Sequence, residues 1–275
     1  MGPLAGQLLL ESLLAPGLLA ALVMLLARGS GYGPLAPFAP VLAIALAIGT
    51  TYVLAFGWPP GPAVGARAKI LLSAVIGLAV GVAIQGRIRW YRFGFITAAI
   101  GIPIWIGLPA LQQMNLESVL LILPVTAALA VLPIIGKTAP SASSPQILIL
   151  LTLTVSLAAI AVFAKTFSFA ELGLSLGSAL LAILTIDRKP LAAPAVIMAA
   201  AMLSALITAL LLYSEVSLPA LLVLAFVIGA DRLARLWTGG RKAHPSIWLV
   251  LVFCILPAAA AILIARIDAG AISIY

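Results

Sequence analysis

The chain has 275 residues, of which 64% are hydrophobic and only 8% are charged. Soluble domains carry about 25% charged residues, so this composition excludes an ordinary soluble protein. The net charge of +8 comes from basic residues in short connections between apolar segments, which indicates orientation in a membrane and argues against nucleic-acid binding.

Long apolar segments follow one another along the chain. A helix needs about 20 apolar residues to cross a bilayer, and these runs lack the alternation of barrel strands. The sequence therefore predicts an all-α, polytopic transmembrane helix bundle with about ten spans. Eight or nine spans with a re-entrant piece are the alternative, because 70–85 and 169–186 are short. In chain order the predicted segments are 5–27, 36–57, 70–85, 93–111, 118–136, 146–164, 169–186, 191–213, 216–236 and 247–266.

We expect one integral membrane domain over residues 1–275, with a polar linker at 137–145 between the halves 1–136 and 146–275. Five spans in each half would invert the second half relative to the first, an arrangement found in many transporters. Leu123-Pro124 and Leu256-Pro257 both precede alanines and match weakly across the halves. The sequence is compatible with two inverted five-helix halves and equally with two unrelated halves.

Basic residues are distributed unevenly between the two sides that ten spans define. Eleven Lys and Arg residues lie in the odd-numbered connections and four in the even-numbered connections and C-terminal tail. Short basic loops stay in the cytoplasm, so we expect a bacterial-type inner-membrane protein with both termini outside. The larger set is Arg28, Arg87, Arg89, Arg92, Lys137, Arg188, Lys189, Arg232, Arg235, Arg241 and Lys242, and the smaller set is Arg67, Lys69, Lys165 and Arg266.

Groups that carry enzymatic chemistry are scarce. His244 is the one histidine, and it lies beside Arg241 and Lys242 in a predicted loop. Zinc, haem and Ser-His-Asp chemistry need a positioned imidazole or several soft ligands, and an acidic cluster for Mg²⁺ is lacking. We therefore expect no enzyme, no catalytic residue, no metal and no cofactor.

Glu11 is the first candidate site residue, because it lies inside the apolar run of the first segment. Gln7 lies one turn earlier on the same helical face. A polar face on a spanning helix should point into the bundle, where it could bind a proton, a cation or a cationic group. The alternative is a helix that begins at Ser12, with Glu11 at the membrane surface.

Prolines and amides mark a second region, in the segments 93–111 and 118–136. Proline removes a backbone donor, and irregular backbone at membrane depth is tolerated only inside protein or along a cavity. A solute path along these segments and ordinary proline kinks are the two interpretations. The candidate residues are Pro103, Trp105, Gln112, Gln113, Asn115 and Pro124.

Three further patterns have a structural interpretation beside a functional one. Asp231 and Arg235, at i and i+4, predict a structural ion pair. The stripe Arg87, Arg89 and Arg92 either holds anionic lipid headgroups or only sets the orientation. Glu171 begins the predicted segment 169–186, where a carboxylate suits the helix dipole.

Two glycine motifs predict close helix contacts. Gly77-x-x-x-Gly81 and Gly173-x-x-x-Gly177 place glycines on one helical face, which lets a neighbouring backbone approach.

Two functions fit these observations. One is a small transporter or permease that moves a small or lipid-like solute by alternating access between the halves. The other is a non-catalytic membrane subunit that scaffolds, or helps to assemble, a larger membrane complex, which would suit helices with few polar groups. The expected partners are membrane lipids and either a second copy or other membrane subunits, without nucleic acid.

Overall fold

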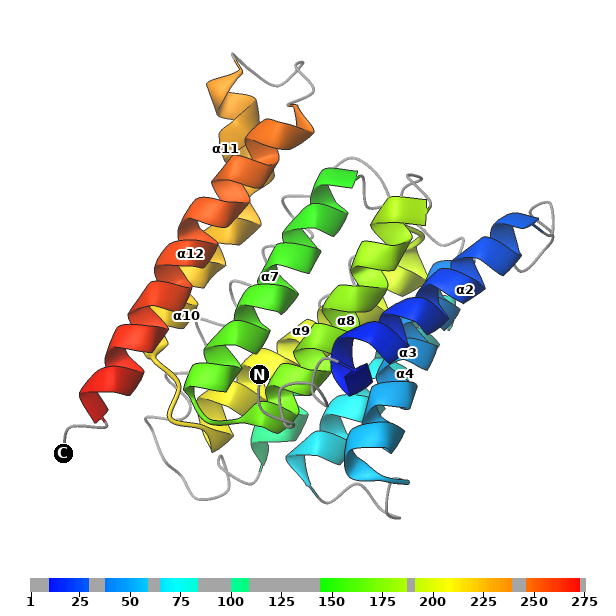
Figure 1. Ribbon diagram of the computed structural model, residues 1–275, viewed down its shortest axis with the longest axis horizontal. Coiled ribbons are helices and arrows are strands. Elements are labelled where there is room, and N and C mark those ends of the chain that lie inside the picture. Colours follow the sequence, from blue (N-terminus) through cyan, green and yellow to red (C-terminus); the bar gives the residue numbers. More distant parts are fainter. Residues whose placement is uncertain are drawn as a thin grey trace.

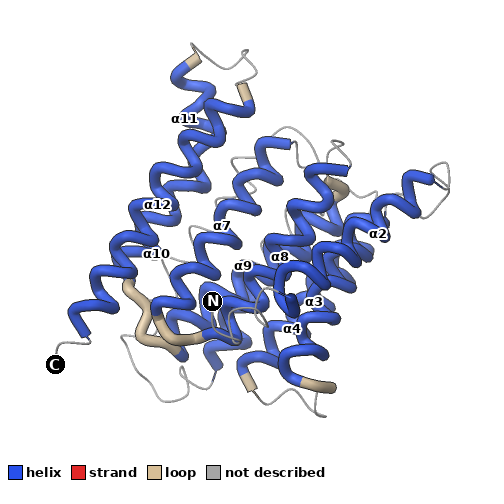
Figure 2. Tube along the Cα trace, in the orientation of Figure 1, coloured by secondary structure: helices blue, strands red, loops and turns tan. Residues whose placement is uncertain are grey.

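The computed structural model describes residues 10–29, 38–58, 65–83, 100–108, 144–186, 191–238 and 246–272. Within these ranges the chain is almost entirely helical (Figure 2). Seven helices are long and apolar enough to cross a membrane. The expectation of a helical integral membrane protein is thereby confirmed.

The helices follow the apolar segments in chain order (Figure 1). A short π-helix, η1, leads directly into α2, and the connection between α9 and α12 contains two short helices separated by a 3-10 turn, η3. A further helix covers residues 100–108. The bounds are η1 Leu10–Leu14, α2 Ala15–Gly29, α3 Ala39–Phe56, α4 Ala66–Ala83, α7 Ser144–Phe163, α8 Phe167–Ile186, α9 Ala193–Tyr213, α10 Leu218–Ala225, η3 Phe226–Gly229, α11 Ala230–Trp237 and α12 Ile247–Ile272.

Several predicted segments differ from the observed helices. The two short segments become complete helices of 18 and 20 residues, α4 and α8, so neither is a re-entrant piece. The segment 216–236 is interrupted by η3. The last two residues of the predicted linker, Ser144 and Pro145, belong to α7. The segment 118–136 lies outside the described residues.

The helices that precede residue 108 pack directly on the helices that follow residue 144. α2 and α3 contact α8, and α4 packs along α9. α9 is the most buried of the seven candidate spans, whereas α2 and α12 are the most exposed. Their exposed faces carry leucines and isoleucines such as Leu18, Leu22 and Leu263, as expected for surfaces in contact with lipid.

Glycines lie at the contacts of α4 with α9 and of α8 with α7. A Cβ at Gly81 of α4 would lie 2.6 Å from Pro194 Cα of α9, and one at Gly77 would lie 2.7 Å from Ala201 Cβ. On α8, a Cβ at Gly173 would lie 3.1 Å from Ala158 Cβ of α7. Both glycine motifs therefore face a neighbouring helix, as predicted, because only a residue without a side chain permits this approach.

The described basic residues fall into two groups at opposite ends of the bundle. Arg28, at the end of α2, donates to the Ile186 carbonyl at the end of α8 (3.2 Å), and α11 ends on the same upper side of Figure 1 with Arg232 and Arg235. The lower end holds the beginnings of α4 and α8 and the ends of α7 and α12. Its basic residues are Arg67, Lys69, Lys165 and Arg266. The two groups contain the described members of the two sets that the loop assignment separates, which are three residues of the larger set and all four of the smaller.

Candidate functional site

Glu11 lies in the π-helix η1 and is half-buried. Pro16, near the start of α2, has no N–H to donate to the Ser12 carbonyl, so a regular α-helix cannot run through this point. The Thr51 hydroxyl of α3 donates instead to the Glu11 carbonyl (3.1 Å). Single turns of π-helix are rare and frequently lie at functional sites.

A second carboxylate, Glu171 of α8, lies close enough to Glu11 for electrostatic interaction, and the positive charge of Arg67 of α4 acts on it as well. Arg67 is exposed, with its guanidinium 4.9 Å from the centre of the Phe56 ring. The structure therefore brings together two carboxylates and one guanidinium from three helices at the lower end of the bundle.

Glu171 was expected to complement the helix dipole, and this interpretation is wrong. α8 begins at Phe167, two residues earlier than predicted, so Glu171 lies beyond its first turn. It belongs instead to a polar face with Ser175 and Ser178, at i+4 and i+7. Ser175 is fully buried, and the Ser178 hydroxyl donates to the Ser175 carbonyl (2.8 Å). The face extends about 10 Å along α8 at 1.5 Å per residue.

These polar groups converge from three elements into what we call the polar lane. α2 approaches α8 at Gly17, where a Cβ would lie 3.4 Å from Ser178 Cβ. Ser12 is five residues below Gly17 and Ser175 three residues below Ser178, which places the two serines at similar depth. The polar lane consists of Glu11, Ser12, Thr51, Glu171, Ser175 and Ser178.

Two hydroxyls of the polar lane have no hydrogen-bond partner. Ser12 Oγ and Ser175 Oγ are both buried and unsatisfied, as is Ser204 Oγ on α9, outside the lane. An unsatisfied buried polar group costs about 1–3 kcal/mol. The two unsatisfied hydroxyls on Ser12 and Ser175 belong to the same polar lane as the two carboxylates. They can therefore form hydrogen bonds with a small polar group or coordinate a cation.

The predicted path residues lie only partly within the described chain. Pro103 is buried and Trp105 half-buried in the helix 100–108. Lys69 Nζ lies 3.5 Å from the Trp105 carbonyl, to which it donates, and the Tyr213 hydroxyl donates to the Ile106 carbonyl (3.1 Å). These bonds fasten the helix to α4 and α9. Gln7, Gln112, Gln113, Asn115, Pro124, Arg87, Arg89 and Arg92 lie outside the described residues.

The ion pair predicted from the i,i+4 spacing is present on α11, at the other end of the bundle. Arg235 Nη2 lies 2.9 Å from Asp231 Oδ2, and Arg235 Nε donates to the same oxygen (3.0 Å). Asp231 is buried and its Oδ1 has no partner, whereas Arg235 is partly exposed. The pair joins neighbouring turns of one helix, which fits the structural role proposed from the sequence.

Comparison with known proteins gives no relative: no family model, curated protein or solved structure matches the chain.

Proposed function

We propose that this protein is a small multi-pass transporter that moves a small or lipid-like solute by alternating access. The polar lane is the observation that carries this proposal. Two half-buried carboxylates beside four buried hydroxyls are costly to place in an apolar bundle, and ionisable groups within membrane helices generally mark ion or substrate pathways. The π-helical turn at η1 adds to this, since such turns are frequent at functional sites.

The proposed topology has ten crossings and two inverted five-helix halves. In this proposal the seven candidate spans and the interrupted α10–η3–α11 would make eight crossings, and the segments 93–111 and 118–136 would supply the others. The basic-residue asymmetry assigns the end with Arg28, Arg232 and Arg235 to the cytoplasm of a bacterial-type inner membrane. Both termini, and the end of the polar lane at Glu171, would then face outward.

The chemistry of the polar lane suggests which ion and which kind of solute would cross the membrane. Two carboxylates near one guanidinium favour a proton or a cation as the coupling species, with Glu11 as its main ligand. Most of the remaining buried surface is apolar. A solute that is itself partly apolar would therefore suit this interior better than a sugar or another strongly hydrophilic compound.

The rival function, a scaffold or assembly subunit, has one observation in its favour. α11 exposes Leu236 and Trp237 at the upper end, where a partner subunit could pack. Purification in mild detergent distinguishes the transporter function from the scaffold function. The transporter predicts a monomer or homodimer without other subunits, measured by native mass spectrometry. A membrane protein that co-purifies in fixed stoichiometry would favour the scaffold.

A further inference from the structure

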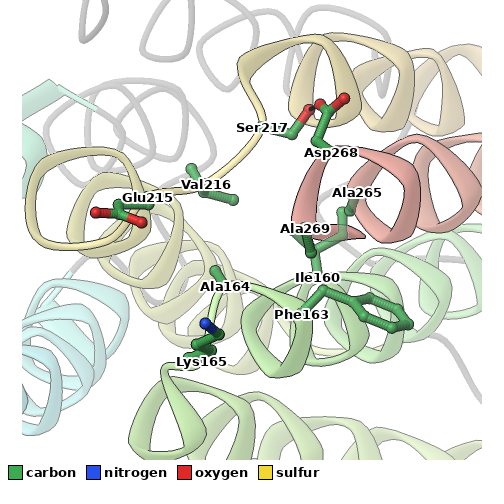
Figure 3. A pocket seen from close by; sticks show the side chains of 10 residues that line it. All are labelled: Ile160, Phe163, Ala164, Lys165, Glu215, Val216, Ser217, Ala265, Asp268 and Ala269. Atoms are coloured by element: carbon green, nitrogen blue, oxygen red, sulfur yellow. Dashed lines mark hydrogen bonds between the residues drawn. The ribbon is translucent and has the colours of Figure 1, made fainter. Parts of the chain in front are cut away.

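A pocket of about 480 Å³ opens at the lower end of the bundle, apart from the polar lane (Figure 3). It lies between the end of α7, the connection from α9 to α10 and the last turns of α12. Pockets that bind small ligands have volumes of about 300–1,000 Å³. Its charged lining residues are Lys165, Glu215 and Asp268, none of which belongs to the lane.

Lys165 occupies a backbone position that usually requires glycine. The Thr166 N–H donates to the Ala161 carbonyl (2.9 Å) and the Lys165 N–H to the Val162 carbonyl (3.0 Å), the two bonds of a Schellman motif that ends α7. Lys165 itself has a left-handed backbone, with φ of 57°. Glycine is the common residue there because a Cβ is disfavoured. The strained position thus fixes a lysine at the rim of the pocket, as is frequent at ligand sites.

Asp268 is held in place on another side of the pocket. Its Oδ2 accepts a hydrogen bond from the Ser217 hydroxyl, and the same Ser217 Oγ accepts from the Ala220 N–H as the N-cap of α10. A carboxylate oriented in this way can accept further hydrogen bonds in a defined direction. In the view of Figure 3, Asp268 and Ser217 lie on one side of the pocket and Lys165 and Glu215 on the other.

The ammonium group of Lys165 is available to a ligand. Neither Glu215 nor Asp268 lies within ion-pairing distance of it in the described chain. The pocket therefore presents one cation and two carboxylates, separated in space, with apolar walls at Phe163 and Val216. A purely anionic ligand would meet two repulsive charges. A ligand with both signs of charge would meet a partner for each.

We propose that this pocket binds a zwitterion with a primary ammonium group, directed to Asp268, and an anionic group, directed to Lys165. The pocket lies where α7, α9 and α12 end, at the level of the lipid headgroups. A phosphoethanolamine headgroup has this chemistry, and so does a free zwitterionic solute. Lys165 would pair with the phosphate or carboxylate, and the ammonium would donate to Asp268 on the opposite side of the pocket.

Titration of the purified full chain with three probes tests the proposal: phosphatidylethanolamine, phosphatidylglycerol and water-soluble glycerophosphoethanolamine. Native mass spectrometry in detergent measures the affinities. We expect phosphatidylethanolamine to bind about tenfold more tightly than phosphatidylglycerol, which lacks the ammonium. If glycerophosphoethanolamine binds as tightly as the lipid, the ligand is a free zwitterion, and if it binds more weakly, the ligand is the lipid headgroup.

A matched set of variants separates binding from folding. Lys165→Gly should weaken phosphatidylethanolamine binding about tenfold, while the melting temperature without lipid stays equal or rises because glycine suits the left-handed backbone. Lys165→Arg should retain binding, and Asp268→Asn should lose it. Arg266→Gln removes a cation of α12 that does not line the pocket and should change nothing. Equal affinity for phosphatidylglycerol, no binding of any probe, or wild-type affinity in Lys165→Gly would overturn the proposal.

Discussion

Glu11→Gln is expected to reduce coupled flux about tenfold or more and to leave the melting temperature close to that of the wild type. Glutamine has the shape of glutamate but carries no charge, so it cannot hold a proton or pair with a cation. Proteoliposomes with a trapped pH-sensitive dye measure the flux, with small primary amines and short-chain phospholipids as probes. Glu11→Asp, which keeps the charge, is the matched control and should retain more flux than Glu11→Gln.

A different outcome would identify Glu11 as a structural partner of Arg67. Glu11→Gln would then lower the melting temperature, and Arg67→Gln added to it would restore part of the loss, because both charges would be gone. Unchanged flux together with unchanged stability would contradict both roles. In that case Glu11 would be a carboxylate of the membrane surface without consequence for transport.

Gly81→Ala is expected to destabilise the protein by about 1–3 kcal/mol, the usual cost of overpacking. The added Cβ would meet Pro194 of α9 at 2.6 Å from its Cα and 3.1 Å from its carbonyl oxygen. These are backbone atoms, which cannot move aside like the end of a flexible side chain. Thermal unfolding in detergent, followed by tryptophan fluorescence, measures the loss.

Gly49→Ala is the matched control for this prediction. Gly49 lies inside α3, and no heavy atom beyond its chain neighbours and the nearby backbone of its own helix lies within 4 Å of the position a Cβ would take. Alanine there should be neutral or should stabilise the helix by up to about 1 kcal/mol, because alanine has the higher helix propensity. Gly81→Ala should thus lower the free energy of unfolding, whereas Gly49→Ala should leave it unchanged or raise it. Equal effects at both positions would contradict the packing of α4 on α9.

Hydropathy predicted where most helices lie, because a polar backbone inside lipid must form its own hydrogen bonds. It predicted α8 and α9 within two residues at either end. It could not predict which helices pack together, since a side chain that faces lipid and one that faces a helix are both apolar. On α7, for example, Leu153 is buried and Val155 is exposed. The two Gly-x-x-x-Gly motifs were the exception, because a helical face of two glycines permits another helix to approach closely.

The polar lane was predictable only in part. Glu11 was visible as a charge within an apolar run. The residues that meet it, however, are distant in sequence: Thr51, which donates to its carbonyl, is 40 positions away, and Glu171, whose charge acts on it, is 160 positions away. Glu171, Ser175 and Ser178 share one helical face in the sequence, but a helix that begins at residue 169 puts Glu171 in its first turn, where the helix dipole accounts for the charge. A start at Phe167 moves Glu171 out of the first turn and removes the reason to regard it as a cap.

Cysteine accessibility at Ser175 tests the transport proposal most directly. Ser175 and Ser204 are both fully buried, and the lone Cys254 can be replaced by alanine. Alternating access requires the lane to open to water, so a membrane-impermeant maleimide should label Ser175→Cys from both sides, in right-side-out and in inverted vesicles. Labelling should be faster from outside, where the proposed orientation puts Glu171, and Ser204→Cys should stay unlabelled. A Ser175→Cys variant as unreactive as Ser204→Cys from both sides would contradict a lane that opens during transport.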